Sequence, residues 1–292
     1  MTKAGFVTVA GFPNAGKSTL LNLLVGEKLA ITSSKAQSTR HRVVGIRTEH
    51  GAQMVILDTP GLLEPRDTLH SAMRNAALAA VREADVLVHV VDGTRGRVVP
   101  FEEAAGIEHP PRAAIVLALN KVDLLDASAR TNLQRQHPDS VLVSASTGEG
   151  IATLVSRITH VLPDSPYLYP DDELSSQPLR FFCAEFVRET ALELLGDELP
   201  HALACEIEEF REQSSPLYIR AVLHVERESQ KRIVIGANGQ QIKKLGRISR
   251  EKIERFVGHP VYLDLWVKVL PNWRKNRSAV LRLGYGDPKE RA

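Results

Sequence analysis

Eight consecutive residues near the start of the chain have the types and spacing that would hold phosphate groups. The apolar run at 6–10 leads into Gly-Phe-Pro-Asn-Ala-Gly-Lys-Ser, and a helical pattern follows. Glycines let a backbone wrap around phosphates, and amide groups at a helix start point toward negative charge. Lys17 would reach the β- and γ-phosphates of a nucleotide, and Ser18 would hold Mg²⁺. The motif predicts a phosphate-binding loop with contacts from Gly11, Phe12, Pro13, Asn14, Ala15, Gly16, Lys17, Ser18 and Thr19.

Two further motifs stand at the ends of apolar runs. Asp58-Thr59-Pro60-Gly61 follows the run at 54–57, and its carboxylate suits Mg²⁺ through water, although a plain strand-ending turn is the alternative. Asn120-Lys121-Val122-Asp123 follows the run at 113–119, at a strand end where open α/β sheets bind ligands. The Asp123 carboxylate can accept from N1–H and the exocyclic amine of guanine, whereas adenine offers neither donor. We expect Asn120 and Lys121 to brace this loop, with further backbone contacts from Ser144, Ala145 and Ser146.

The formal net charge of +2 hides a strong asymmetry late in the chain. Residues 171–213 hold 12 Asp or Glu and 3 Arg, a net of 3 − 12 = −9. Residues 227–255 hold 9 Lys or Arg and 3 Glu, a net of 9 − 3 = +6. Basic clustering of this kind fits a polyanionic partner, and a solvated helix face is the alternative.

The elements that must position these motifs follow from the hydrophobic pattern. Through residue 162, short apolar runs alternate with helical patterns, which predicts an α/β domain with a mostly parallel sheet flanked by helices. Four prolines at 163–178 would stop both helix and central strand, so we place a linker there. Residues 179–272 follow as a smaller domain, and 273–292 as a tail. The expected elements of the smaller domain are a helix at 179–195, a hairpin of 202–211 and 217–227, helices at 230–235 and 240–256, and a strand at 261–269.

Composition excludes several protein classes. The 2 cysteines have no CxxC spacing, which suits a reducing compartment and argues against structural zinc. No apolar run approaches the ~18 residues of a membrane span, and Met1 leads almost directly into a strand, leaving no room for a signal peptide. We therefore expect a cytosolic protein.

The nucleotide motifs resemble those of the translation-factor-related GTPases, and Lys35-Ala36-Gln37-Ser38-Thr39-Arg40-His41 resembles the first switch of the Era family. Ala36 and Ser38 stand where that family has Pro and a first Thr. The resemblance implies a P-loop GTPase domain that binds GTP or GDP with Mg²⁺ and hydrolyses GTP. It implies Ser18, Thr39 and Asp58 as the metal ligands, and Lys17, Thr39, Gly61 and Asn14 as catalytic residues.

One departure from Ras-like enzymes concerns catalysis. Leu62 takes the place of their water-orienting Gln and cannot polarise water, so another group, a cation or a partner must complete hydrolysis. The resemblance implies that Asn14 holds a potassium ion near the β- and γ-phosphates. A turn residue is the alternative role for Asn14.

The second domain contains a Gly-x-x-Gly loop, a motif too short to mean anything alone. The loop at 93–96 matches as well and looks ordinary, whereas the loop at 236–239 joins two helices within the basic stretch and the order α-β-β-α-α-β. That combination resembles a type II KH domain, a smaller α+β fold whose loop approaches a nucleic-acid backbone. Aliphatic side chains beside the loop (Ile235, Ile242, Leu245 and Ile248) could form an apolar groove for bases or could be plain core. Aromatic residues are scarce, so no stacking platform is evident. The expected RNA contacts are Gly236, Ala237, Asn238, Gly239, Ile242, Lys243, Lys244, Arg247 and Arg250.

The resemblance to the Era family spans essentially the whole chain. It implies binding to the 3′ end of 16S ribosomal RNA, assistance to 30S subunit assembly, a monomeric state, and a cytoplasmic location with some peripheral contact at the inner face of the cell membrane. A second domain that binds protein or anionic lipid is the main alternative. An ATP-dependent metabolic enzyme is disfavoured by Asp123.

Overall fold

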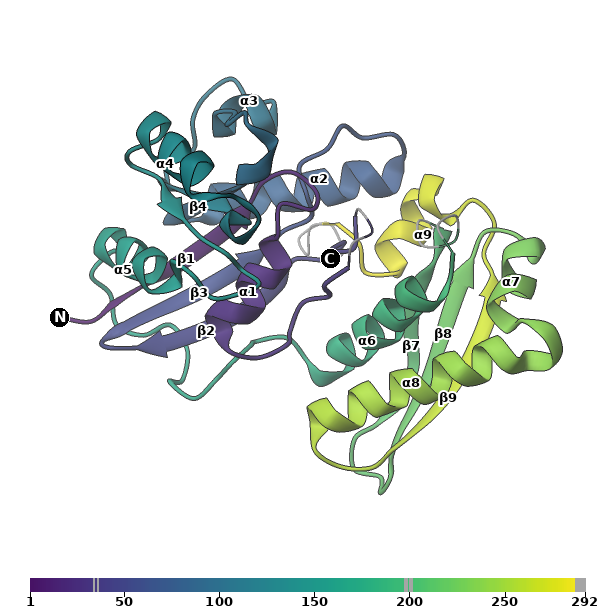
Figure 1. Ribbon diagram of the computed structural model, residues 1–292. Helices are drawn as coiled ribbons and strands as arrows, with labels where there is room; N and C mark the ends of the chain where they lie inside the picture. Colours follow the sequence, from purple (N-terminus) through teal and green to yellow (C-terminus); the bar gives the residue numbers. More distant parts are fainter. Residues whose placement is uncertain (34, 36, 197–198, 200–201, 287–292) are drawn as a thin grey trace.

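The computed structural model describes residues 1–33, 35, 37–196, 199 and 202–286 and shows two α/β units joined by a long connection (Figure 1). Ala36, Asp197 and Glu198, which entered the expectations above, lie outside the described residues, as do 287–292 of the tail. None of the described helices is long and apolar enough to cross a membrane.

The first unit is a sheet in the order β2-β3-β1-β4-β5-β6, flanked by helices (Figure 1). All its pairings are parallel except that of β2 with β3. Strands β3 and β4 are buried along their whole length, as expected for strands covered on both faces. The strands are β1 (Lys3–Ala10), β2 (Val43–Glu49), β3 (Ala52–Asp58), β4 (Val86–Asp92), β5 (Ala114–Asn120) and β6 (Val141–Leu142), and the helices are α1 (Lys17–Val25), α2 (Thr68–Glu83), α3 (Phe101–Ala105), α4 (Ala127–Gln136) and α5 (Ile151–Val161).

The second unit is a sheet in the order β7-β8-β9 with α6 and α8 on the same face (Figure 1). Strand β7 is antiparallel to β8, and β9 is parallel to β8. The predicted order α-β-β-α-α-β and the α/β plus α+β fold class are confirmed. The elements are α6 (Leu179–Leu194), β7 (Ala204–Arg211), β8 (Leu217–Val225), α7 (Glu228–Ile235), α8 (Gln240–Val257) and β9 (Val261–Val269).

The proline-rich connection forms no regular helix but lies along the edge of the first sheet. Ile46 N donates to Leu174 O at 2.8 Å, and Ser175 Oγ donates to Val44 O at 2.5 Å. The Gln53 carboxamide oxygen accepts from the backbone of residues 168 and 169. The connection therefore covers the outer edge of β2, the strand that directly follows the first-switch segment. The limits 162, 178 and 272 for the units stay a prediction.

The described part of the tail packs between the two units. Trp273 is fully buried and donates from Nε1 to Ala202 O at 2.9 Å. Helix α9 (Arg277–Arg282) brings Val280, with Trp273 and Tyr285, into an apolar cluster with Met73 of α2. The tail thus contacts both units, a position that local sequence pattern does not predict.

Candidate nucleotide and RNA sites

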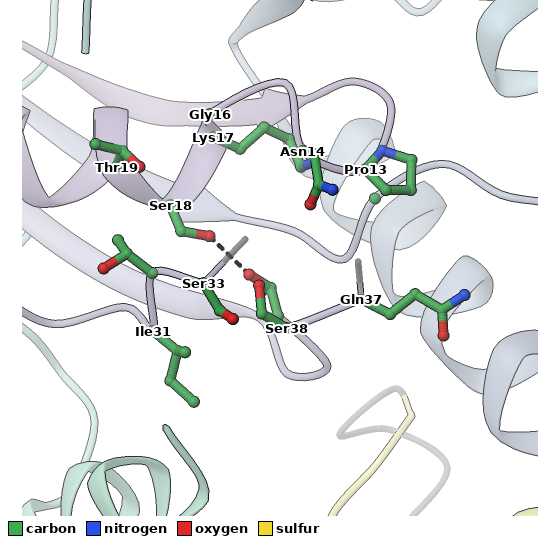
Figure 2. Close-up of a pocket in the computed structure, with 13 residues that line it drawn as sticks. Pro13, Asn14, Gly16, Lys17, Ser18, Thr19, Ile31, Ser33, Gln37 and Ser38 are labelled. Carbon is green, nitrogen blue, oxygen red and sulfur yellow. Dashed lines mark hydrogen bonds between the residues drawn. The ribbon is translucent and has the colours of Figure 1, made fainter. Parts of the chain in front are cut away.

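The phosphate-binding motif forms the turn between β1 and α1, as predicted. Gly16 has φ +95°, and a Cβ there would lie 2.1 Å from Asn120 Nδ2. Only glycine tolerates both that backbone and that approach. The loop side chains and residues 31–33 and 37–39 face each other across a pocket (Figure 2). Of the predicted contacts, its lining includes Pro13, Asn14, Gly16, Lys17, Ser18, Thr19, Thr39 and Gly61. Gln37 and Ser38 of the predicted first switch also line it, and so do Ile31, Thr32 and Ser33, which carried no recognisable sequence signal.

The three predicted metal ligands converge. Ser18 Oγ donates to Asp58 Oδ2 at 2.6 Å and lies 2.7 Å from Thr39 Oγ1, which is 3.4 Å from the same carboxylate oxygen. The other oxygen, Asp58 Oδ1, is buried and has no hydrogen-bond partner among the described residues. Two hydroxyls and an orphaned carboxylate oxygen are hard ligands that suit a hydrated Mg²⁺ ion. The residues therefore fit the ion that the motif implies.

Burial perturbs the two charged groups of this pocket. Desolvation raises the pKa of Asp58 to about 6, with the nearby Lys17 ammonium opposing the shift. Desolvation likewise lowers the pKa of Lys17 to about 8, against the attraction of Asp58. Lys17 Nζ donates to Phe12 O at 2.9 Å, so its ammonium lies within the curl of the loop. The Phe12 side chain points outward and is 39% exposed, which leaves only its backbone for the phosphate site.

The base-recognition loop is tied to the phosphate loop through Asn120. Its Nδ2 donates to Ala15 O at 2.7 Å, and its Oδ1 accepts from Ala145 N at 2.9 Å. This is the bracing geometry that the sequence predicts for Asn120. Asp123 is exposed, and hydrogen bonds from Ser144 and Ser146 lower its pKa, so it remains an ionised acceptor.

Asp92 is a member of the site that the sequence analysis missed. It ends β4 opposite Asn120 and accepts from Lys121 Nζ at 2.7 Å. Thr94 Oγ1 donates to its other oxygen at 2.6 Å. The available signal was a carboxylate at the carboxyl end of an apolar run, the same signal that identified Asp58.

The residues after Asp58 pack against the phosphate-binding loop and the strand that precedes it. Thr59 Oγ1 donates to Val9 O at 3.0 Å, and a Cβ on Gly61 would lie 2.8 Å from Pro13 N. Pro60, between them, is buried. Leu62 is 1% exposed and packs in an apolar cluster with Phe101 of α3. The side chain at this position therefore lies in the core, away from the pocket.

The first-switch segment is held by the second unit. Arg188 on α6 donates from Nη2 to Ser38 O at 2.5 Å and is fully buried beside Glu185 at 2.6 Å. Arg40 Nη1 donates to Leu203 O at 2.7 Å, and Lys35 Nζ donates to Leu195 O at 2.5 Å. The neighbour of Thr39 on each side is thus fixed by groups beyond the proline-rich connection.

A buried carboxylate links the pocket-lining residue Thr32 to α8. Glu189 Oε2 accepts from Lys28 Nζ and from Lys252 Nζ, each at 2.9 Å. Its Oε1 accepts from Thr32 N at 3.3 Å. Lys252 belongs to α8 and also pairs with Glu193 at 2.7 Å. One side chain therefore contacts both the pocket segment and the long basic helix.

The second Gly-x-x-Gly loop lies at the start of that helix. Gly236 has φ +72°, and a Cβ there would lie 2.6 Å from the Gln241 Cβ, while Gly239 also has a positive φ of +74°. Ala237 and Asn238 at the loop tip are exposed, and so are Lys243, Lys244, Arg247 and Arg250.

The structure distinguishes between the two roles left open for the aliphatic side chains beside this loop, core or apolar groove. Leu245 is fully buried and belongs to the core. Ile235, Ile242 and Ile248 are half-buried, which leaves part of each open beside the loop. Leu245 faces inward because the buried positions Leu245, Ser249 and Ile253 repeat every four residues along α8.

Comparisons with known proteins agree with this geometry. Residues 6–121 match the family model described as "50S ribosome-binding GTPase", and residues 198–274 match the model described as "KH domain". GTPase Era of Carboxydothermus hydrogenoformans is 40% identical over 97% of this chain and 98% of its own length. GTPase Era of Pseudomonas fluorescens is 40% identical over 98% of both chains.

Two solved structures extend the likeness to three dimensions. Era of Aquifex aeolicus, in a variant bound to GDP and AlF4⁻, has a TM-score of 0.92 and 38% identity, covering 98% of this chain and 100% of that one. Era in complex with MgGDPNP and nucleotides 1506–1542 of 16S ribosomal RNA has a TM-score of 0.91 and 37% identity with the same coverage. With this identity over nearly its whole length, the chain belongs to the Era family of GTPases.

Proposed function

We propose that this protein is a GTP-hydrolysing switch that binds 16S ribosomal RNA near its 3′ end and assists assembly of the 30S subunit. The observation that carries the proposal is the physical link between the two sites. The segment with Thr39 lines the nucleotide pocket and is held by α6, and Glu189 of α6 contacts Lys252 of the basic helix. The Era structure solved with both MgGDPNP and 16S RNA supports the choice of ligands.

The nucleotide would be recognised at both of its ends. Asp123 would accept from the guanine base, while Asn120 keeps the base loop and the phosphate loop at a fixed separation. Lys17 and the amides of the loop would meet the phosphates. Ser18, Thr39 and Asp58 would hold Mg²⁺, which neutralises charge on the β- and γ-phosphates. Thr39 can join the site only while its segment stays in place, so the segment responds to the γ-phosphate.

Hydrolysis needs a group other than the side chain at 62. Leu62 is buried in the core, so it neither orients water nor blocks the pocket. Figure 2 shows the Asn14 side chain reaching from the loop toward the segment of Ser33 and Ser38. We assign to Asn14 the binding of a potassium ion beside the β- and γ-phosphates, where the ion would supply positive charge.

The RNA site is assigned to the loop at 236–239 and the exposed cations of α8. Glycines at both ends let a backbone approach, and Lys243, Lys244, Arg247 and Arg250 would meet phosphates.

We further propose that the protein acts as a cytoplasmic monomer with peripheral membrane contact, on family resemblance alone. Fractionation of cells at low and high salt would test the location.

Base selectivity tests the nucleotide assignment. In Asp123→Asn the amide would donate to the 2-oxo group of xanthine where the carboxylate accepted from the guanine amine. We expect the preference to move from GTP to XTP, measured by competition with a fluorescent nucleotide. Unchanged GTP selectivity would refute the role of Asp123.

A charge insertion tests the RNA assignment. The double substitution Ala237→Asp and Asn238→Asp should weaken RNA binding by about 1–3 kcal/mol, because it places two negative charges at the closest approach of the backbone. A matched control, Asn132→Asp with Gln136→Asp, adds the same charge to exposed positions of α4. Fluorescence anisotropy with the 16S fragment would show the loss only in the loop variant, with GTP affinity unchanged in both. Equal RNA affinity in the two variants would move the RNA site elsewhere.

A further inference from the structure

Three aromatic side chains of the second unit, Tyr218, Tyr262 and Trp266, lie on one face of its sheet. In the register of β8 and β9, Tyr218 lies opposite Tyr262, and Val222 lies opposite Trp266. The rings of Tyr218 and Tyr262 stack at 5.7 Å with an angle of 11° between their planes. Tyr262 is 57% exposed and Trp266 is 53% exposed. Sequence composition made a stacking platform look absent, yet two-residue periodicity along β9 places these rings on one side.

This face is opposite the helices. Leu263, Leu265 and Val269 alternate with the aromatic positions on β9 and pack toward the core. A Cβ on Gly246 of α8 would be 3.9 Å from Leu265, so α8 lies directly behind the strand. Among the described strands β9 is an edge of the sheet. An RNA strand that leaves the basic side chains of α8 therefore has to pass around β9 alone to reach the aromatic face.

The carboxylates named on this face all have hydrogen-bond or ion-pair partners. Asp264 accepts from Arg220 Nε at 2.9 Å and from Trp266 Nε1 at 2.7 Å. Glu209 pairs with both Arg211 and Arg220. Arg211 also lies 4.8 Å from the Tyr218 ring centroid, with its guanidinium over the ring. Glu208 pairs with Lys268, and Glu206 Oε2 lies 2.8 Å from His224 Nε2, a contact that is an ion pair only when the imidazole is protonated.

A surface of exposed rings and arginine planes, on which the named carboxylates already have partners, is complementary to nucleobases rather than to phosphates. Unpaired bases of RNA stack on Tyr, Trp and Arg planes, while the phosphates take lysines and arginines elsewhere. Here the phosphate-binding charges lie on α8, and the stacking surface lies on the far side of β9. The two surfaces together would hold a single strand by its backbone and by its bases.

We propose that Tyr262 and Trp266 form a second RNA-binding site, a platform on which unpaired bases stack after the strand has passed α8 and the edge of β9. The proposal rests on the proposed function, because it requires that the protein bind RNA. It adds a contact whose energy comes from stacking, with little release of counterions. Its contribution to affinity should therefore depend far less on salt than that of α8.

The chain offers a direct optical test, since its two tryptophans differ completely in exposure. Trp266 is 53% exposed, whereas Trp273 is fully buried. Titration with unlabelled RNA of the 1506–1542 fragment should quench the wild-type emission. Trp266→Phe should keep the affinity within about threefold, because phenylalanine still stacks, and should abolish the quenching. RNA binding without any change in wild-type tryptophan emission would overturn the proposal.

Affinity and its salt dependence supply the second test. Trp266→Ala should weaken binding about tenfold, within the range for one base–aromatic stack, and leave the slope of log K against log salt unchanged. Lys243→Gln should lower affinity and reduce that slope by about 0.7–1. Tyr167→Ala removes a partly exposed ring from the connection and should change neither quantity.

The outcomes separate this inference from the proposed function. Failure of the wild type to bind the RNA would contradict the proposed function and this inference with it. Wild-type binding with unchanged affinity in Trp266→Ala would overturn the platform alone and leave the face to a protein partner. A Trp266→Ala loss that disappears at high salt would also overturn it, because stacking is not screened.

Discussion

Replacing Glu189 by Gln tests the link between the nucleotide pocket and the second unit. Its carboxylate is 1% exposed and accepts from Lys28 Nζ, Lys252 Nζ and Thr32 N. The substitution keeps the shape and removes the charge that both ammonium groups face. Breaking a fully buried ion pair costs about 3–5 kcal/mol. Lys28 is 47% exposed and can return to water, and Lys252 keeps Glu193, so we expect about 1–3 kcal/mol.

Glu193 provides a matched control on the same helix. Its side chain is 44% exposed and contacts Lys252 at 2.7 Å. Glu193→Gln removes the same charge from an exposed pair and should cost less than about 1 kcal/mol. Urea unfolding followed by circular dichroism, with the nucleotide-free proteins, would give both free energies of unfolding. Equal losses in the two variants, or no loss in Glu189→Gln, would refute the reasoning that Glu189 joins the two units.

Three further predictions concern the nucleotide pocket. Asn120→Ala should lower GTP affinity about 100-fold, measured by calorimetry. The reason is that Ala15 O and Ala145 N would stay buried without their hydrogen-bond partner, at a cost of about 1–3 kcal/mol each. GTP affinity within threefold of wild type would contradict the bracing role of Asn120. Burial raises the folded-state pKa of Asp58 to about 6, above the value of 3.8 that an exposed carboxyl has in the unfolded chain, so the folded state holds an extra proton between these pH values. The free energy of unfolding of the metal-free protein should therefore fall by up to about 3 kcal/mol, relative to Asp58→Asn, as the pH rises from about 4 to 6. If urea denaturation gave the two proteins the same dependence of this free energy on pH, the pKa shift would be contradicted. GTP hydrolysis should be faster in potassium than in sodium at equal ionic strength, and Asn14→Ala should remove the difference; equal wild-type rates would refute the cation role.

The parts of the fold that follow from local pattern could be predicted from the sequence. Apolar runs and helical patterns alternate through the first unit, and the motifs at 58–61 and 120–123 stand at strand ends that a parallel sheet brings together. Strand β2 was missed, because its mixed sequence gains its order from pairing with β3 along its whole length. Asp92 was missed because its role depends on a register that places it opposite Asn120.

Contacts between distant residues account for the rest. The Arg188 guanidinium meets Ser38 O across 150 positions of sequence, and Lys28 meets Glu189 across 161. Nothing in the pattern around either residue specifies such a partner. The acidic stretch that stood out by composition includes Glu185 and Glu189, which the structure uses as buried partners of cations. The composition showed that this stretch is acidic. Only the folded structure shows that two of its carboxylates are buried partners of Arg188, Lys28 and Lys252.

We infer that the bound nucleotide controls RNA binding through the segment that carries Thr39. The most direct measurement is the affinity of one protein preparation for the 1506–1542 RNA fragment, first with MgGDP and then with MgGDPNP. We predict that the two dissociation constants differ by at least about fivefold, the lower end of common coupling free energies, and that Glu189→Gln brings them closer together. Equal RNA affinity in the two nucleotide states of the wild type would contradict the account.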